Sequence, residues 1–185
     1  LLEYNKKLKK IEGEEPSTRV IRRRIIPSKD TPVKKIISGG QVGADQFGLE
    51  VAQALGIETG GTAPPGFQTS KGKQKAKLEG FGLTEGEPDT KVYPKRTKKN
   101  VIDSDGTVLF GDEASPGSRL TKKLATQHGK PYLANPTVEQ LSEWLSKNNI
   151  KTLNIAGNRK ASPRMKDVLR EALGLPEKEE RPSGA

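Results

Sequence analysis

The residues best suited to chemistry lie in one glycine-rich turn, Ser38-Gly39-Gly40-Gln41, which Gly43 and Asp45 follow. A β-branched run precedes this turn and an amphipathic segment follows it, so the pattern predicts a strand–turn–helix unit. Glycines let the backbone approach a ligand closely, and the first N–H groups of a helix have no intrahelical partner. We therefore interpret the turn as a cradle for phosphate or another oxyanion. A tight crossover turn that binds nothing is the alternative.

A second glycine turn, Gly117-Ser118, opens another amphipathic segment. Its N–H groups and hydroxyl suit an anion, and Ser118 is a favoured helix cap that would also touch a ligand. An ordinary cap is the alternative. If both helices begin at the same sheet edge, the two turns would share one negatively charged ligand.

Five further polar residues are candidates for the same site. Asp103 and Asp105 precede an apolar run and would bind a divalent cation or ribose-like hydroxyls, although an Asx turn uses the same residues. Arg96 offers a fork for phosphate or carboxylate, with a solvated surface arginine as the alternative. Asn158 and Arg159 follow a predicted strand, where they would meet a ligand or simply form the turn.

Composition narrows the chemistry that the chain can carry. The sequence has no cysteine and one histidine, His128, which excludes disulfides and thiolate chemistry and makes zinc binding implausible. It has no G-x-S-x-G elbow and no familiar nucleophile–base pair, so any catalysis would rest on carboxylates and arginine, and binding is better supported than catalysis. We find no signal peptide and no run of about 20 apolar residues, which predicts a cytoplasmic protein without a membrane contact.

The elements that must position these residues alternate along residues 33–175, which we expect to form one domain. Predicted strands are Val33–Ser38, Gly106–Phe110, Pro131–Ala134 and Thr152–Ile155, and predicted helices are Ala44–Gly56, Ser118–Gly129, Thr137–Asn148 and Pro163–Gly174. Short apolar strands joined by single helices are typical of an α/β fold, with a mostly parallel sheet and helices on both faces. Ligands of such folds bind beyond the carboxyl ends of the strands. Residues 60–80, rich in glycine, lysine and proline, are expected to form a long loop over that edge.

The basic charge is concentrated in residues 1–32, a predicted N-terminal arm. Residues 1–35 hold eleven Lys and Arg against five acidic residues, which accounts for +6 of the net charge of +10. The Arg22-Arg23-Arg24 run between isoleucine pairs would bind nucleic-acid phosphates or add a strand to a partner protein, with a solvated tail as the alternative. Residues 176–185 are predicted to be a disordered tail.

Several short motifs occur in order along residues 35–172: Ile37-Ser38-Gly39-Gly40-Gln41, Thr59-Gly60-Gly61, Ala63-Pro64, Arg96-Thr97, Asp103-Ser104-Asp105-Gly106-Thr107, Gly117-Ser118 and Leu153-Asn154-Ile155-Ala156-Gly157. In these motifs the segment resembles the molybdenum carrier family, a circularly permuted, YpsA-related branch of the SLOG superfamily. The resemblance implies a Rossmann-like fold and a pocket at the glycine turns. It also implies a homo-oligomer.

By the same resemblance, the ligand would be a nucleotide or the phosphorylated pterin of molybdenum cofactor. Related phosphoribohydrolases carry a catalytic glutamate in a P-G-G-x-G-T-x-x-E motif, and this chain has Thr121 at that position. The leading hypothesis is therefore a carrier of a phosphorylated small molecule. Two alternatives remain: a nucleotide hydrolase acting on an N-glycosidic or phosphoester bond through Asp45, Asp103 or Asp105, and an interaction protein that uses the arm.

Overall fold

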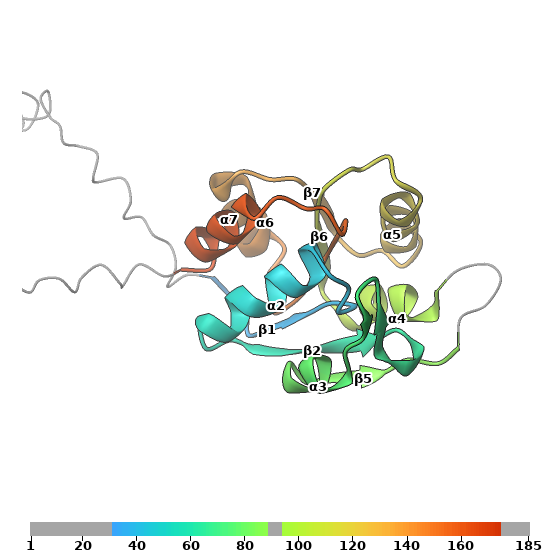
Figure 1. The fold of residues 1–185 in the computed structure, drawn as a ribbon. Coiled ribbons are helices and arrows are strands. Elements are labelled where there is room, and N and C mark those ends of the chain that lie inside the picture. The colour runs from blue at the N-terminus through green and yellow to red at the C-terminus, as the bar shows by residue number, and fades with distance from the viewer. Residues whose placement is uncertain (1–30, 89–93, 175–185) are drawn as a thin grey trace, which may run out of the picture.

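The computed structural model describes residues 31–88 and 94–174 (Figure 1). Their main feature is a six-stranded sheet with the order β5-β2-β1-β8-β6-β7, in which all pairs of neighbours are parallel. The strands are β1 Lys35–Ile37, β2 Glu58–Ala63, β5 Leu83–Glu85, β6 Gly106–Phe110, β7 Tyr132–Ala134 and β8 Thr152–Gly157. A two-stranded antiparallel hairpin, β3 Gln68–Thr69 with β4 Gly72–Lys73, follows the short 3₁₀ helix η4 Pro65–Phe67.

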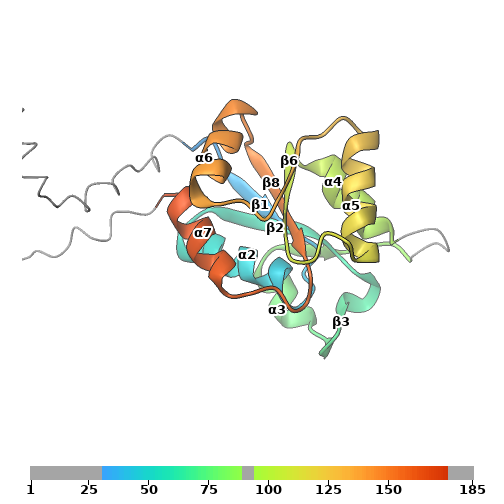
Figure 2. The ribbon, with the colours of Figure 1, turned by 90° about the horizontal axis from the view of Figure 1, so that it is seen from above.

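Helices cover both faces of the sheet. The helices are α2 Ala44–Ala54, α3 Lys75–Gly80, α4 Lys95–Asp103, α5 Pro116–Gln127, α6 Val138–Lys147 and α7 Arg164–Ala172. Seen from above, α6 and α7 lie on one side of the strands and α4 and α5 on the other (Figure 2). The predicted α/β fold with a parallel sheet covered on both faces is therefore confirmed.

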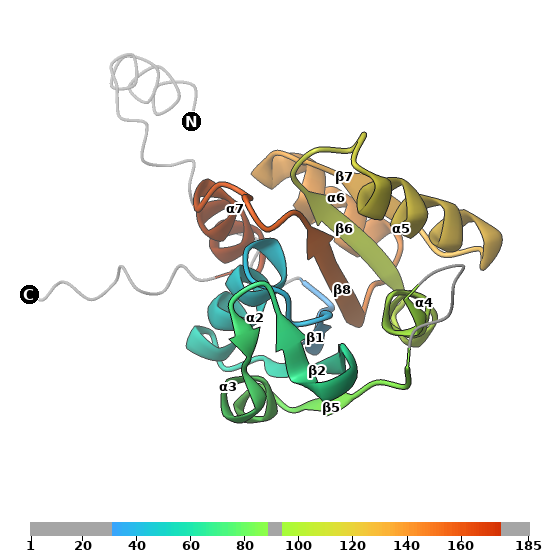
Figure 3. The ribbon, with the colours of Figure 1, turned by 45° about the vertical axis from the view of Figure 1, so that its right-hand side comes forward.

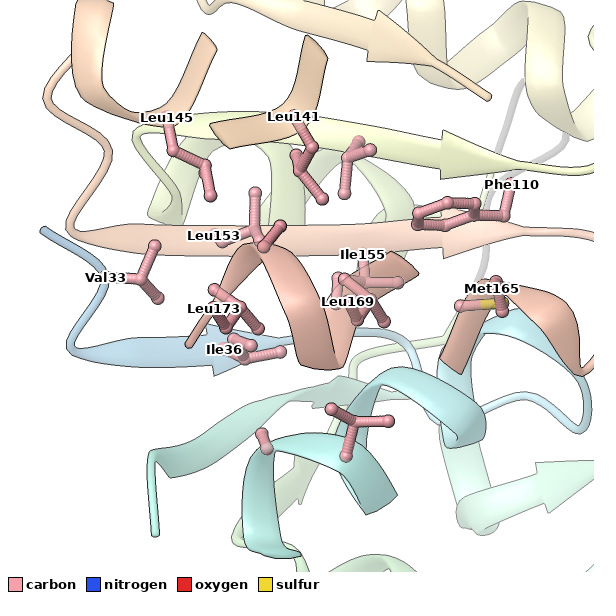
Figure 4. Close-up of a cluster of buried hydrophobic side chains, with 14 of the residues drawn as sticks. Val33, Ile36, Phe110, Leu141, Leu145, Leu153, Ile155, Met165, Leu169 and Leu173 are labelled. Atoms are coloured by element: carbon pink, nitrogen blue, oxygen red, sulfur yellow. The ribbon is translucent and has the colours of Figure 1, made fainter. Parts of the chain in front are cut away.

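The largest apolar cluster lies between the sheet and α2, α6 and α7. Leu141, Leu145 and Leu169 contribute side chains that face Leu153 and Ile155 of β8, one of the two central strands of the sheet (Figure 4). These five side chains are fully buried. The other face is covered more thinly, by a small cluster around α4 and α5, so the space between those helices and the sheet is where a pocket has room to form.

The predicted elements agree with the structure to within a few residues, and one prediction is wrong. Residues 60–80 do not form a long loop, because they contain most of β2, the β3–β4 hairpin and α3. Glycines weaken the prediction of a strand. Gly61 is nevertheless required in β2, because a Cβ atom at this position would overlap the backbone of Ser38, the residue that follows β1. Neither α4 nor β5 is among the elements predicted from the sequence.

The predicted tail and nearly all of the arm lie outside the described residues. Within the described ranges, no helix is long and apolar enough to cross a membrane.

Candidate functional site

A pocket of about 490 Å³ opens beyond the carboxyl ends of β1, β6 and β8, which we call the carboxyl edge. Its lining combines residues from the glycine turn, the start of α4, the start of α5 and the end of β8: Gly39, Gln41, Asp45, Pro94, Arg96, Thr97, Asn100, Leu109, Pro116, Gly117, Ser118, Leu120, Thr121, Asn154, Ile155, Ala156, Gly157 and Asn158. Seven predicted site residues are among them: Gly39, Gln41, Asp45, Arg96, Gly117, Ser118 and Asn158. Because Asp45 and Arg96 are the two charged residues of this lining, they dominate its electrostatics.

The glycine turn, residues 38–43, is shaped by buried contacts beneath the pocket. Ser38 is fully buried, and its hydroxyl donates to the Asp45 carbonyl at 3.2 Å. Gly40 and Gly43 adopt positive φ angles of 77° and 100°, which favour glycine. A side chain at Gly43 would stand 2.5 Å from the carbonyl oxygens of Asn158 and Arg159, so this glycine lets α2 start directly against the loop after β8.

Two backbone amides of the predicted oxyanion cradle, in the 38–43 turn, bind a side chain of the protein itself. The N–H groups of Gly39 and Gln41 donate to the Asp45 carboxylate, the second at 3.1 Å. At the start of α2, the Ala44 N–H donates to the Asn158 carbonyl at 3.1 Å. Two amides of the turn are thus already bound to an anion, and that anion is the protein's own Asp45 carboxylate.

Asp45 is the most strongly perturbed acid of the site. It is 7% exposed, and desolvation by this burial raises the pKa of Asp45 to about 6, against the smaller opposing effects of Arg96 and of the amides of Gln41 and Gly39. An ideal Cβ atom on Gly39 would lie 3.1 Å from both Asp45 Oδ2 and Arg96 Nη1. The carboxylate and the guanidinium therefore flank the same backbone position.

Arg96 enters the pocket from the first turn of α4, after Pro94 sets the entry of the chain. Its Nη1 donates to the Thr97 hydroxyl at 3.2 Å. Farther along the helix, Asn100 is buried and makes two hydrogen bonds with the backbone of Thr62, at 2.9 and 3.0 Å. That clamp fixes α4 on β2 and holds Arg96 at the pocket.

The cap of α5 differs from the one expected at Ser118. Ser115 is the N-cap, and its Oγ accepts from the Ser118 N–H at 3.2 Å, while Pro116 and Gly117 form the first helical positions. Asn158 Nδ2 also donates to Ser115 Oγ, at 3.2 Å. Among the described residues, the Gly117 N–H has no hydrogen-bond partner. One helix start of the predicted pair therefore retains a free donor at the pocket.

Asp103, Asp105 and Arg159 are not brought to this pocket. Asp103 ends α4 in an exposed ion pair with Lys99, and Asp105 accepts from the N–H groups of Lys151 and Thr152 at 2.9 Å. Both aspartates precede β6 in the chain and therefore lie at its amino end, opposite the carboxyl edge. Figure 3 shows the parallel course of β6 and β8 toward that edge. The Arg159 side chain is exposed and outside the lining.

Several lining residues were missed by the sequence analysis. Asn154, buried in β8, donates to the Thr107 hydroxyl at 3.1 Å, and the Thr121 hydroxyl donates to the Gly117 carbonyl at 3.0 Å. A polar residue inside an apolar strand is a usable signal for Asn154. In the part of the chain that the structure describes, no three His, Cys, Asp or Glu residues are grouped to hold a metal ion.

Comparison with known proteins identifies the family. A model of the circularly permutated YpsA SLOG family matches residues 36–174. The chain belongs to this family. The match spans every element that forms the pocket, from the 38–43 turn to the loop after β8.

A solved structure agrees with this assignment. A crystal structure of a "putative molybdenum carrier protein" from Syntrophus aciditrophicus SB is 34% identical, with a TM-score of 0.65, and the match covers 77% of this chain and 94% of that one. A diphosphate reductase, (E)-4-hydroxy-3-methyl-but-2-enyl diphosphate reductase, is 14% identical with a TM-score of 0.35, covering 76% and 59%, a likeness too weak to inform function. Among curated proteins, none matches this chain.

Proposed function

We propose that this SLOG family member binds and carries a phosphorylated small molecule, of the nucleotide or the molybdenum-cofactor class, in the pocket at the carboxyl edge. The observation that carries the proposal is that Arg96 and the start of α5 line the same pocket. A guanidinium donates charge-assisted hydrogen bonds to phosphate oxygens, and the free N–H of Gly117 at a helix start adds a further donor. These groups supply positive potential where a phosphate would bind.

The rest of the lining suits the organic part of such a ligand. Leu109, Leu120 and Ile155 give an apolar wall, while Asn154 and Thr121 place amide and hydroxyl groups beside it. Small-molecule sites commonly have volumes of about 300–1,000 Å³ and combine apolar walls with a few polar groups. The name of the Syntrophus relative adds support for molybdenum cofactor as the cargo.

The test is thermal unfolding and calorimetric titration of the full chain with nucleoside monophosphates, inorganic phosphate and purified molybdenum cofactor. A ligand that binds the native state raises its stability by mass action. Replacing Arg96 by alanine removes charge-assisted hydrogen bonds and is expected to weaken binding about 10- to 100-fold. Lys99→Ala is the matched control, because Lys99 is on the same helix but exposed and paired with Asp103. The proposal fails if no compound stabilises the protein, or if both variants bind like wild type.

A second candidate function is hydrolysis of a bound nucleotide. Asp45 favours it, because a buried carboxyl group with a pKa of about 6 is suited to proton transfer near neutral pH. Thr121, at the position of the glutamate in the related hydrolases, argues against it. The discriminating measurement is the release of free base or phosphate from nucleotides, compared between wild type and Asp45→Ala. Pure carriage gives no product with either protein.

A further inference from the structure

The amides of residues 39–42 in the 38–43 turn are satisfied from within the turn and the start of α2. Four consecutive N–H groups donate to side chains of the same segment: Gly39 and Gln41 to Asp45, Gly40 to Ser38 Oγ, and Val42 to Gln41 Oε1. A phosphate placed at this turn would find four consecutive amides, those of residues 39–42, already bonded to the protein's own side chains. It would also meet the Asp45 carboxylate, whose negative charge repels an anion most strongly where water is excluded.

Asp45 still has hydrogen-bonding capacity toward the pocket. An ionised carboxylate has about four acceptor positions and donates nothing, and the two turn amides occupy two of them. Asp45 is also part of the pocket lining. N–H and O–H donors of a ligand that displaces water from the pocket can therefore satisfy its remaining acceptor positions.

We infer that Asp45 is a specificity-determining residue, which accepts hydrogen bonds from a paired donor group of the ligand and thereby limits the site to one phosphate, bound by Arg96 and the start of α5. This inference rests on the proposed function and adds the ligand's chemistry to it. Two donor groups have the required chemistry: the N–H and amino pair of a 2-amino-4-oxo heterocycle, and the vicinal hydroxyls of a ribose.

The geometry places groups of opposite charge side by side in the pocket wall. Arg96 Nη1 and Asp45 Oδ2 each lie 3.1 Å from the ideal Cβ position of Gly39, so cation and anion occupy neighbouring parts of the wall. The free Gly117 N–H comes from a different element, α5. A ligand with an anionic end and a donor-bearing end complements this arrangement, and a chain of phosphates does not.

A first experiment needs no variant. Calorimetric titration of the full chain compares a nucleoside monophosphate with the matching diphosphate and triphosphate. We expect the added phosphates to give no gain in affinity, so that the Kd values of the diphosphate and triphosphate are equal to or higher than that of the monophosphate. A tenfold gain for the diphosphate would overturn the inference, because the turn would then be binding the second phosphate.

The second experiment uses Asp45→Asn, which removes the charge but keeps one acceptor oxygen for the turn amides. Replacing the charged acceptor is expected to weaken the binding of a donor-bearing monophosphate by about tenfold, because charge-assisted hydrogen bonds are about twice as strong as neutral ones. The same change should leave inorganic phosphate binding unchanged or make it tighter, since a repelling charge is lost. Equal weakening of both probes would overturn the inference.

The monophosphate series distinguishes the donor groups. Guanosine against inosine monophosphate removes the 2-amino group, and ribonucleotide against 2′,3′-dideoxynucleotide removes the hydroxyl pair. Removing one of these two donor groups should weaken the binding of the monophosphate to wild type and have little effect on its binding to Asp45→Asn. If neither does, Asp45 does not select the ligand. If monophosphates bind through Arg96 while these tests fail, the inference alone is wrong, whereas absence of any phosphate-dependent binding removes the proposed function as well.

Discussion

At the scale of the residue, Asp45 shows how a site keeps a group in an unfavourable environment. Its carboxylate is buried among the turn amides, and desolvation outweighs the favourable effect of Arg96. Two amide hydrogen bonds and a nearby cation therefore do not fully replace the water that the group loses on folding. A buried acid of this kind lowers the free energy of unfolding at neutral pH, which is a cost that proteins commonly accept at functional sites.

This argument predicts that Asp45→Asn stabilises the unliganded protein at neutral pH. The pKa of Asp45 is raised from 3.8 to about 6 on folding, so the native state holds a proton that the unfolded state releases between these values. Wild type therefore loses stability as pH rises through this window, up to about 3 kcal/mol in total, and loses nothing more above it. Urea unfolding of both proteins should give a difference that is small near pH 4 and grows to its full value by pH 7.

The matched control is Asp103→Asn. Asp103 is about half exposed in an ion pair with Lys99, and such surface pairs contribute about 0–1 kcal/mol. The free energy of unfolding of this variant should differ from wild type by no more than that at any pH above 5. A difference for Asp45→Asn that does not change with pH would contradict the raised pKa.

At the scale of the element, the pocket depends on how the start of α2 packs against the loop after β8. The Ala44 N–H donates to the Asn158 carbonyl, and the Asn158 side chain reaches the Ser115 cap of α5. Asn158 thus connects the starts of two helices that are far apart in the sequence. Gly43 makes this approach possible, because a side chain there would collide with the carbonyls of Asn158 and Arg159.

Two glycines at helix starts should therefore respond differently to alanine. At Gly43, φ is +100° and a Cβ atom would lie 2.5 Å from two carbonyl oxygens, so Gly43→Ala should cost about 2 kcal/mol or more of the free energy of unfolding. At Gly117, no atom lies within 4 Å of the Cβ position, and alanine favours a helix over glycine by up to about 1 kcal/mol. Chemical denaturation of both variants tests this. Equal losses would show that Gly43 is not constrained as described.

At the scale of the whole molecule, the parallel α/β architecture and the site edge could be predicted from the sequence, and the hydrogen bonding inside the site could not. Apolar runs and capping signals locate β6, β8, α5 and α6 closely, because burial and caps leave local patterns. β2 leaves no such pattern, since its glycines are required by contact with β1. The acceptors of the turn amides also depend on tertiary position, since Asp45 acts there from the first turn of α2. Asp103 and Asp105 directly precede β6, and residues before a strand lie at its amino end. Their position away from the carboxyl edge could therefore have been predicted from chain order alone.

The three apolar clusters draw their residues from positions 33–173, which predicts that the domain folds without the predicted arm. A chain lacking residues 1–30 should unfold within about 2 °C of the full chain, because these three clusters stay intact, as a removal costing under 0.5 kcal/mol would imply. We propose that the arm binds nucleic acid, and its three consecutive arginines should contribute about −2 to −3 to the slope of log K against log salt concentration for single or double strands. Full chain and deletion variant are compared by fluorescence anisotropy on a labelled oligonucleotide at several salt concentrations. Association that does not change with salt would instead favour strand addition to a partner protein, and a large drop in the unfolding temperature would make the arm part of the folded domain.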